Sequence, residues 1–323
     1  MGIQSVIIST GSYLPERILT NEDLSKMVDT SDEWITQRTG IRQRHIAVEG
    51  QTTSDMATLS AKEALTKAGL DASDIDGIIV ATTTPDLTFP STAALVQDKL
   101  DLRSGFAFDV QAVCSGFVYG LSVADSMIKA GTAKRMLLIG AEKMSSILDW
   151  DDRATCVLFG DGAGAVILEA QEVEEGSEVG ILSTHIRSDG SKHELLCTSG
   201  GPSKNAQTGV LLMQGREVFK YAVQHLSQIV DTVLEHHQIQ PDVIDWIVPH
   251  QANLRIIEST AKKINMSMDQ VVVTLPEHGN TSAASIPLAF DKAVSDGRIQ
   301  KGQMVLMEAM GGGFTWGAAL LRF

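Results

Sequence analysis

Three residues that lie far apart in the sequence carry side chains that together could perform acyl transfer. Cys114 lies in the run 105–120 (GFAFDVQAVCSGFVYG), His250 in PHQAN, and Asn280 in GNTSAAS. A thiolate can attack a thioester and form a covalent intermediate. Imidazole and amide N–H groups can stabilise negative charge on an oxygen. The same residues also have structural interpretations: a free cysteine is often a small buried hydrophobe, and an asparagine often forms a turn.

The sequence places Cys114 where a strand gives way to a helix. Apolar residues alternate over 106–110, which predicts a strand, and from Phe117 they follow a helical period. The start of a helix offers unpaired N–H groups and the positive end of the helix dipole. We therefore expect the pKa of the Cys114 thiol to be lowered.

His250 and a run of glycines each follow a predicted strand. His250 comes directly after the strand at 246–248, and Gly311-Gly312-Gly313 follows the strand at 304–307. In open α/β sheets, ligands bind beyond the carboxyl ends of the strands. Glycines at such a place can direct backbone N–H groups at an oxyanion, although a tight loop is the simpler interpretation.

Strands and helices alternate along the chain, and the pattern is repeated. We expect strands at 3–9, 78–81, 106–110, 136–139 and 163–168, and, after the acidic turn 172–178, at 246–248, 271–274, 304–307 and 317–321. About 34 residues separate Val80 from Cys114, and about 32 separate Val248 from Asn280, as a duplicated unit predicts. The fold class is therefore α/β with two pseudo-symmetric halves, 1–172 and 173–323. Asn280 is expected at the position in the second half that Cys114 occupies in the first.

Composition excludes several classes of protein. The chain has 323 residues, 43% of them hydrophobic, and a formal net charge of −14, which argues against nucleic-acid binding. No apolar run is long enough to span a membrane, and three widely spaced cysteines make neither a disulfide framework nor a metal site. We therefore expect a cytoplasmic protein with reduced thiols. The glycine-rich run 159–165 is not a dinucleotide loop, because a strand and not a helix follows it.

Several motifs in order resemble β-ketoacyl-acyl carrier protein synthase III, the initiating condensing enzyme of bacterial type II fatty acid synthesis. They are SDEWITQRTGIRQRHIA near the start, VCSG, PHQAN, GNTSAAS and the ending GGGFTWGAALLRF. The resemblance implies a thiolase-like fold in which two βαβαβαββ halves form five layers, α/β/α/β/α. It also implies a homodimer, no permanently bound cofactor or metal, and two partners: a CoA thioester and acyl carrier protein.

The resemblance further implies a mechanism. Cys114 takes an acyl group, most simply acetyl, from acyl-CoA, and malonyl-acyl carrier protein then loses carbon dioxide and attacks the acyl-enzyme. His250 and Asn280 stabilise the negative charge that develops on the malonyl thioester oxygen. The N–H groups of Cys114 and Gly312 form the oxyanion hole. Cys114 needs no general base if the helix dipole already lowers its pKa.

Binding residues are implied in the same way, position by position. For CoA they are Trp34 and Arg153, on either side of the adenine, with Arg38 and Asn253 nearby; for the acyl pocket, Leu158, Phe159 and, from across the dimer, Phe89; for the carrier protein, Lys220, Arg255, Lys262 and Lys263. An acidic carrier protein would need such a basic patch on a chain of net charge −14.

Other functions remain open on the sequence alone. A paralogue with the same three residues could join or transfer longer or unusual acyl chains in a specialised pathway. A non-catalytic acyl-binding subunit has no chemical need for Cys114, His250 and Asn280 together. A thiolase would carry a second cysteine in the last loop, and an elongating condensing enzyme a second histidine in place of Asn280; this chain has neither.

Overall fold

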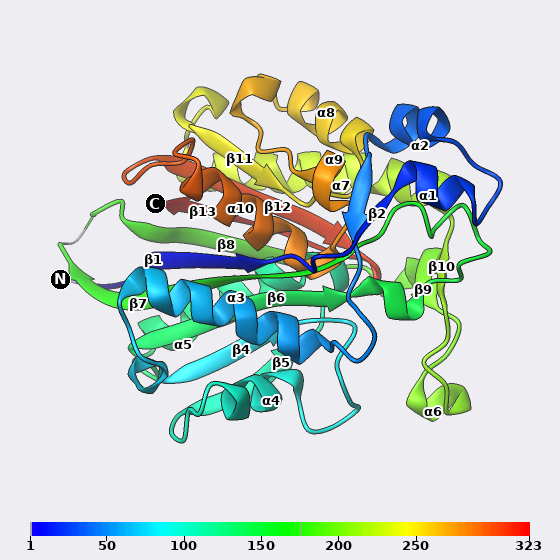
Figure 1. The fold of residues 1–323 in the computed structure, drawn as a ribbon. Helices are drawn as coiled ribbons and strands as arrows, with labels where there is room; N and C mark the ends of the chain where they lie inside the picture. The colour runs from blue at the N-terminus through cyan, green and yellow to red at the C-terminus, as the bar shows by residue number, and fades with distance from the viewer. Residues whose placement is uncertain (1, 175) are drawn as a thin grey trace.

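The computed structural model describes residues 2–174 and 176–323, whose strands form two large sheets (Figure 1). The first has the order β1 (Gly2–Tyr13), β7 (Asp161–Val173), β6 (Arg135–Lys143), β4 (Gly77–Ala81), β5 (Phe106–Val110). The second has the order β11 (Trp246–Pro249), β12 (Met304–Gly311), β13 (Thr315–Arg322), β8 (Gly180–Ser188). Among the described residues, no helix is both long and apolar enough to cross a membrane.

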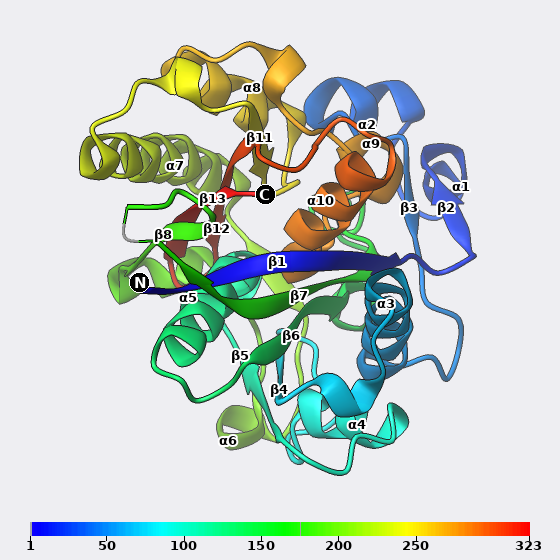
Figure 2. The ribbon, with the colours of Figure 1, turned by 90° about the vertical axis from the view of Figure 1, so that its left-hand side faces the viewer.

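Helices separate and cover the two sheets, so that the molecule has five layers (Figure 2). Between the sheets lie α5 (Gly116–Lys129) and α10 (Ser285–Ser295). The outer face of the first sheet is covered by α3 (Thr53–Ala68) and α4 (Thr92–Lys99), and that of the second by α7 (Gly215–His237) and α8 (Leu254–Lys263). The expected α/β/α/β/α architecture is confirmed.

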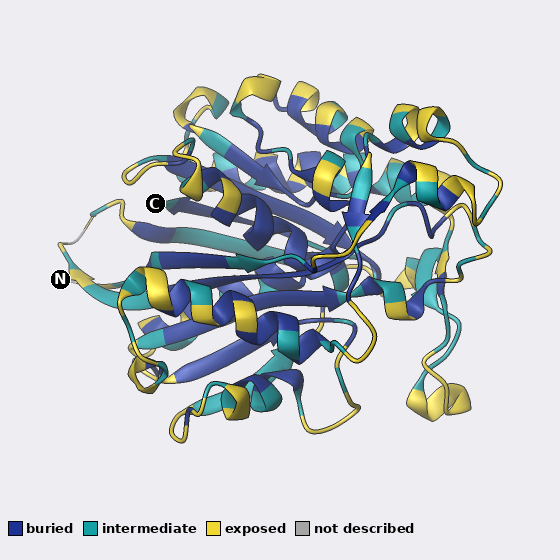
Figure 3. Ribbon diagram, in the orientation of Figure 1, coloured by how far each residue is buried: buried dark blue, intermediate teal, exposed yellow. Residues whose placement is uncertain are grey.

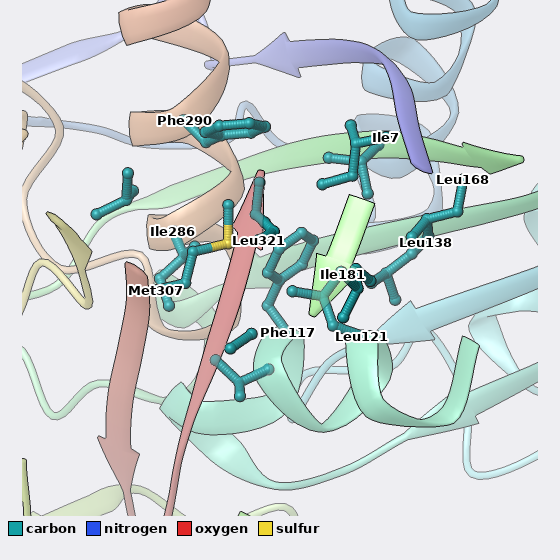
Figure 4. Packing of buried hydrophobic residues seen from close by; sticks show 14 of the residues in the cluster. Ile7, Phe117, Leu121, Leu138, Leu168, Ile181, Ile286, Phe290, Met307 and Leu321 are labelled. Atoms are coloured by element: carbon teal, nitrogen blue, oxygen red, sulfur yellow. The ribbon is translucent and has the colours of Figure 1, made fainter. Parts of the chain in front are cut away.

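The central layer is held by apolar packing. Phe117 of α5 and Phe290 of α10 are fully buried, among side chains from both sheets such as Leu138 and Leu321 (Figure 4). Each such side chain contributes about 1.5–3 kcal/mol when it is removed from water. Because both sheets are covered on both faces, their strands are mostly buried, while the outer helices alternate buried and exposed residues (Figure 3).

The two sheets repeat one topology. The sequence β1-β7-β6-β4 in the first sheet corresponds to β8-β13-β12-β11 in the second, with the same parallel and antiparallel pairings. This confirms the two pseudo-symmetric halves. The predicted strand at 271–274, the counterpart of β5, is wrong: only Val271 pairs, in a single bridge with Ile247.

The side chain of Gln251 explains that missing strand. Its Nε2 donates to the carbonyl of Val272 at 3.0 Å, and its Oε1 accepts from the N–H groups of Thr274 at 2.8 Å and Leu275 at 3.1 Å. Backbone groups that a strand ladder would use are thus satisfied by one buried amide.

Shorter elements gather around one end of the sheets. Ser31 caps α2 (Asp32–Thr39), accepting a hydrogen bond from the N–H of Trp34, and Gly40 ends this helix with φ 84°. The remaining elements are β2 (Ile18–Thr20), α1 (Asn21–Ser25), β3 (Gln43–His45), β9 (Leu196–Thr198), α6 (Pro202–Asn205), β10 (Leu211–Met213) and α9 (Leu275–His278). In Figure 1, α2, β9 and β10 lie on the right, the side toward which β6 of the first sheet and β12 of the second point.

Candidate active site

A cavity of about 740 Å³ brings together residues from both halves of the chain. Cys114, His250 and Asn280 all line it. Further walls come from α2, β9, β10, α7 and α8. Three residues that lie far apart in the sequence therefore line one cavity.

Cys114 lies in the 3₁₀ turn Val113–Ser115, immediately before α5, and is 5% exposed. Burial, the largest cause, raises the pKa of its thiol from 9.0 to about 12, and the nearby Glu142 adds to the rise. The prediction of a lowered pKa is therefore wrong. A helix terminus contributes at most about 2 kcal/mol, whereas a rise of this size corresponds to about 4 kcal/mol.

His250 directly follows β11 and is held on two sides. Its backbone N–H donates to the backbone carbonyl of Glu308 at 2.8 Å, and the ring atom Nδ1 lies 2.7 Å from Ser285 Oγ. Ser285 Oγ also accepts from the N–H of Gln251, which favours donation of the hydroxyl proton to Nδ1 and leaves the ring proton on Nε2. Burial lowers the pKa of His250 to about 3, so the imidazole is neutral.

Asn280 is fixed by its backbone and by one side-chain atom. Its N–H donates to the carbonyl of Leu158 at 2.9 Å, and its carbonyl accepts from the N–H of Gly160 at 3.0 Å. Its Oδ1 accepts from the N–H of Ser282 at 2.9 Å. That bond assigns the amide orientation and leaves Nδ2 as a neutral donor for the cavity.

The repeat aligns differently from the sequence-based expectation. The 3₁₀ turn before α5 is Val113–Ser115, and the 3₁₀ turn before α10 is Ser282–Ala284. The residue equivalent to Cys114 is therefore Ala283, and the prediction that Asn280 occupies that position is wrong. Asn280 reaches the cavity from three residues upstream.

The glycine run packs directly against the cysteine turn. Gly311, at the end of β12, lines the cavity, and a Cβ placed on it would lie 2.6 Å from the nitrogen of Cys114. Gly312 does not line the cavity; a Cβ there would lie 2.8 Å from the carbonyl oxygen of Leu196. Only glycine fits at these two positions. The role of the Gly312 N–H stays a prediction.

Three of the four residues expected to bind CoA line the cavity: Trp34, Arg38 and Asn253. Asn253 Nδ2 donates to the carbonyl of Arg38, whose guanidinium lies 4.5 Å from the Trp34 ring centroid. Arg153 lies outside the cavity lining, 5.4 Å from the same centroid, and pairs with Asp29. An aromatic base between Trp34 and Arg153 needs about 7 Å, two van der Waals separations, so Arg153 must move outward to admit it.

Of the residues expected to form the acyl pocket, two line the cavity and one does not. Leu158 and Phe159 line the cavity together with Met144, Leu196 and Leu211. Phe89 does not: it is 82% exposed in the loop after β4.

The expected carrier-protein residues are exposed on two neighbouring helices. Lys220 lies on α7, and Arg255, Lys262 and Lys263 lie on α8, which packs against α7. Of these four, only Arg255 lines the cavity.

Sequence reasoning missed Arg216, which lines the same cavity from the first turn of α7. The sequence did contain a signal for this residue, because the positive charge of an arginine at the start of a helix is unfavourable next to the positive end of the helix dipole. Among the described residues, Arg38, Arg216 and Arg255 form no ion pair.

Comparisons with known proteins identify the family of the chain. The model of 3-oxoacyl-[acyl-carrier-protein (ACP)] synthase III matches residues 108–190, and the model of its C-terminal part matches residues 234–323. A β-ketoacyl-[acyl-carrier-protein] synthase III of Rhodospirillum centenum is 59% identical over 100% of both chains, and one of Thiobacillus denitrificans is 61% identical over 99% of both. The crystal structure of the synthase III of Aquifex aeolicus VF5 has a TM-score of 0.93 and 50% identity, and covers 99% of this chain and 100% of that one. The chain therefore belongs to the 3-oxoacyl-[acyl-carrier-protein] synthase III family.

Proposed function

We propose that this chain catalyses the decarboxylative condensation of an acyl-CoA, acetyl-CoA first, with malonyl-acyl carrier protein. The product is a 3-oxoacyl-acyl carrier protein, the starting compound of type II fatty acid synthesis. One observation carries the proposal: a buried thiol and two neutral hydrogen-bond donors, Cys114, His250 and Asn280, line one cavity.

In the first half-reaction the sulfur of Cys114 attacks the acyl-CoA carbonyl carbon, and the bond from that carbon to the CoA sulfur breaks. The Cys114 thiol loses its proton, and CoA takes up a proton and leaves as a thiol. The N–H groups of Cys114 and Gly312 receive the developing oxyanion. Trp34, Arg38, Arg153 and Asn253 hold the CoA, and Arg153 swings away from Trp34 to admit the adenine. Neither a metal nor a permanently bound cofactor takes part.

In the second half-reaction the malonyl group loses carbon dioxide, and negative charge moves onto its thioester oxygen. His250 Nε2 and Asn280 Nδ2 donate to that oxygen. Neutral donors suit this step because they stabilise the enolate without protonating it; removal of one such donor costs about 2.7–4 kcal/mol of transition-state stabilisation. The carbon nucleophile then attacks the acyl carbon of the acyl-enzyme, and the bond from that carbon to the Cys114 sulfur breaks, which frees the cysteine.

The proposed assembly is a homodimer. β5 is an edge strand of the first sheet, and its residues are only partly buried, Phe106 and Phe108 among them. Leu87 and Phe89, in the loop before α4, are 52% and 82% exposed. A second copy that pairs along β5 would cover these apolar side chains and bring Phe89 to the partner's acyl pocket.

The remaining assignments complete the proposal. The carrier protein docks on Lys220, Arg255, Lys262 and Lys263, which attract its acidic surface. The protein acts in the cytoplasm, and its halves divide near residues 172 and 173.

Intact-protein mass spectrometry with a panel of acyl-CoA thioesters tests the proposal. We expect a single acetyl adduct on the Cys114 peptide, no adduct in Cys114→Ala, and discharge by malonyl-acyl carrier protein. Preference for long or branched chains would favour the specialised paralogue instead. An adduct that persists in Cys114→Ala would remove this cysteine from its role.

A further inference from the structure

The side chain of Gln251 is buried between the two segments that lead to the donors of the second half-reaction, and it is 1% exposed. An amide group has two N–H bonds and an oxygen with two lone pairs. Both N–H bonds are used, because Nε2 donates to the carbonyls of Pro249 at 2.8 Å and Val272 at 3.0 Å. Both lone pairs are used as well, because Oε1 accepts from the N–H groups of Thr274 at 2.8 Å and Leu275 at 3.1 Å. The amide is therefore completely hydrogen-bonded, and its partners belong to both segments.

On one side, Gln251 supports the loop that carries His250. His250 lies between Pro249, whose carbonyl accepts from Gln251 Nε2, and Gln251 itself. The backbone N–H of Gln251 donates to Ser285 Oγ at 3.3 Å, and the same hydroxyl lies 2.7 Å from His250 Nδ1. Gln251 therefore fixes the chain on both sides of His250 and contacts the hydroxyl that orients the imidazole.

On the other side, Gln251 holds the start of the helical turn that leads to Asn280. Thr274 precedes α9 and makes no capping bond with its own side chain, so Gln251 Oε1 is the acceptor for the first N–H groups of this turn. Within the turn, the N–H of Gly279 donates to the carbonyl of Leu275 at 3.0 Å, and Asn280 is the next residue. Because the turn is short and closed by its own hydrogen bond, a displacement of its start displaces Asn280.

We propose that Gln251 is a positioning residue for decarboxylation, which fixes the His250 loop relative to the turn that carries Asn280. Two donors stabilise one enolate oxygen only when both are aimed at the place where its charge develops. The N–H of Val272 also joins the two segments, through the carbonyl of Ile247 at 2.9 Å, but this bond lies further along the chain from both donors. The amide of Gln251 is the contact next to them, and it keeps His250 Nε2 and Asn280 Nδ2 converging on the malonyl thioester oxygen.

Gln251 takes no part in the first half-reaction. In the part of the chain that the structure describes, all four partners of its side chain are backbone groups, so it bonds with neither Cys114 nor a CoA-binding side chain. Asn253, two residues further along, is held independently: its side chain accepts from the N–H of Arg255 at 2.9 Å and donates to the carbonyl of Arg38 at 3.0 Å. Loss of the Gln251 bonds should therefore slow condensation and spare both acylation and the binding of acyl-CoA.

Two substitutions in the full-length enzyme test this separation. Gln251→Met keeps the length of the side chain and removes all four bonds. Gln251→Glu keeps the two accepted bonds, but a carboxyl group has at most one proton for the two carbonyls. For both variants we expect condensation with malonyl-acyl carrier protein to be about 10- to 100-fold slower, with the wild-type acylation rate and KM for acetyl-CoA.

Gln270→Met is the matched control. Gln270 Nε2 donates to the carbonyl of Ile244 at 3.0 Å and so joins the same two segments at the opposite end of β11, away from the donors. We expect both half-reactions to keep their wild-type rates in this variant. A loss of condensation equal to that of Gln251→Met would show that any bond between the segments has the same effect, and would contradict the positioning role.

A double-mutant cycle distinguishes positioning from a general loss of structure. In Asn280→Ala no amide is left to align with His250, so the addition of Gln251→Met should slow condensation by less than about twofold more. Effects that multiply would show that Gln251 acts independently of Asn280, and would overturn the proposal.

This inference rests on the proposed function, but the two fail differently. Absence of an acyl-enzyme in the wild type overturns the function. Wild-type condensation in Gln251→Met, or an equal loss in both half-reactions, overturns only the positioning role. If neither Gln251→Met nor Gln251→Glu folds, the amide serves the fold alone, and the positioning role is likewise overturned.

Discussion

Val113 and Ser282 have the same backbone conformation, with φ 49° in each, and each opens the 3₁₀ turn before one of the two central helices. A positive φ is unfavourable for a residue with a Cβ, most of all for a β-branched valine, and costs about 1–3 kcal/mol. The two halves therefore share one strained turn. In the first half it presents the Cys114 thiol, and in the second it presents the Ser282 hydroxyl, which donates to the buried Glu142.

Asn280→Ala separates the two half-reactions. Nδ2 is a donor for decarboxylation only, so we expect the acyl-enzyme to form at the wild-type rate while condensation falls about 100- to 1,000-fold. Acetyl transfer to the enzyme and carbon dioxide release are measured separately. An unchanged condensation rate would contradict the role of this amide.

Ser285→Ala tests how His250 is oriented. The variant removes the partner of Nδ1, so the ring proton is no longer held on Nε2. We expect a drop of about tenfold in kcat for condensation, with the acylation rate and the KM for acyl-CoA unchanged. Ser285→Thr retains the hydroxyl and should recover part of the rate; recovery no better than that of alanine would count against this bond.

The buried histidines predict a loss of stability in acid. Burial lowers the pKa of His250 to about 3 and that of His278 to about 4, so the unfolded chain binds more protons than the folded one below pH 6.5. The free energy of unfolding should therefore decrease as the pH falls from 6.5 toward 4, by about 1.4 kcal/mol per pH unit for each histidine. Urea unfolding should show a shallower slope for His278→Gln than for wild type, and equal slopes would refute the assignment.

Glu308 has the opposite effect on how the free energy of unfolding depends on pH. Burial raises the pKa of its carboxyl to about 8, so the folded state retains a proton that the unfolded chain releases near pH 4.5. The free energy of unfolding should decrease as the pH rises from 4.5 to 8 and then level off. We expect Glu308→Gln to flatten this dependence in thermal unfolding at pH 6 and pH 8. Glu258→Gln, on the exposed face of α8, is the control.

Arg216 should bind the phosphate of the phosphopantetheine arm. It lines the cavity and, among the described residues, has no ion-pair partner. We expect Arg216→Gln to raise the KM for acetyl-phosphopantetheine about tenfold and to leave that for acetyl-pantetheine, which lacks the phosphate, unchanged. Equal effects on both substrates would show that the contact is not with the phosphate. The control is Arg103→Gln, because Arg103 lies far from Arg216 in the sequence and is ion-paired with Asp98.

Much of the fold was readable from local signals. The helical period that starts at Phe117 and the apolar run at 78–81 were sufficient to place α5 and β4. The strand at 271–274 could not be judged in this way, because a buried amide at Gln251 satisfies its backbone groups. Such a contact joins segments about 20 residues apart, and no local pattern records it.

The candidate active site, too, could be predicted only where local sequence patterns were sufficient. Cys114, His250 and Asn280 could be found because their residue types and motifs are distinctive, and the cavity contains all three. The pKa of Cys114 could not be predicted, because it depends on burial, which the sequence does not give. Burial raises the pKa by more than the helix terminus lowers it. Nor could the contact between the buried Glu142 and the hydroxyl of Ser282, 140 residues away in the sequence, be predicted.

A single-turnover chase tests the central claim most directly. Enzyme acetylated from radioactive acetyl-CoA is isolated and mixed with malonyl-acyl carrier protein. We predict that label leaves the Cys114 peptide and appears in 3-oxoacyl-acyl carrier protein at the rate of carbon dioxide release, and that it remains on the protein in Asn280→Ala. Label that never attaches to Cys114, or that leaves it without carbon dioxide release, would contradict the proposed reaction.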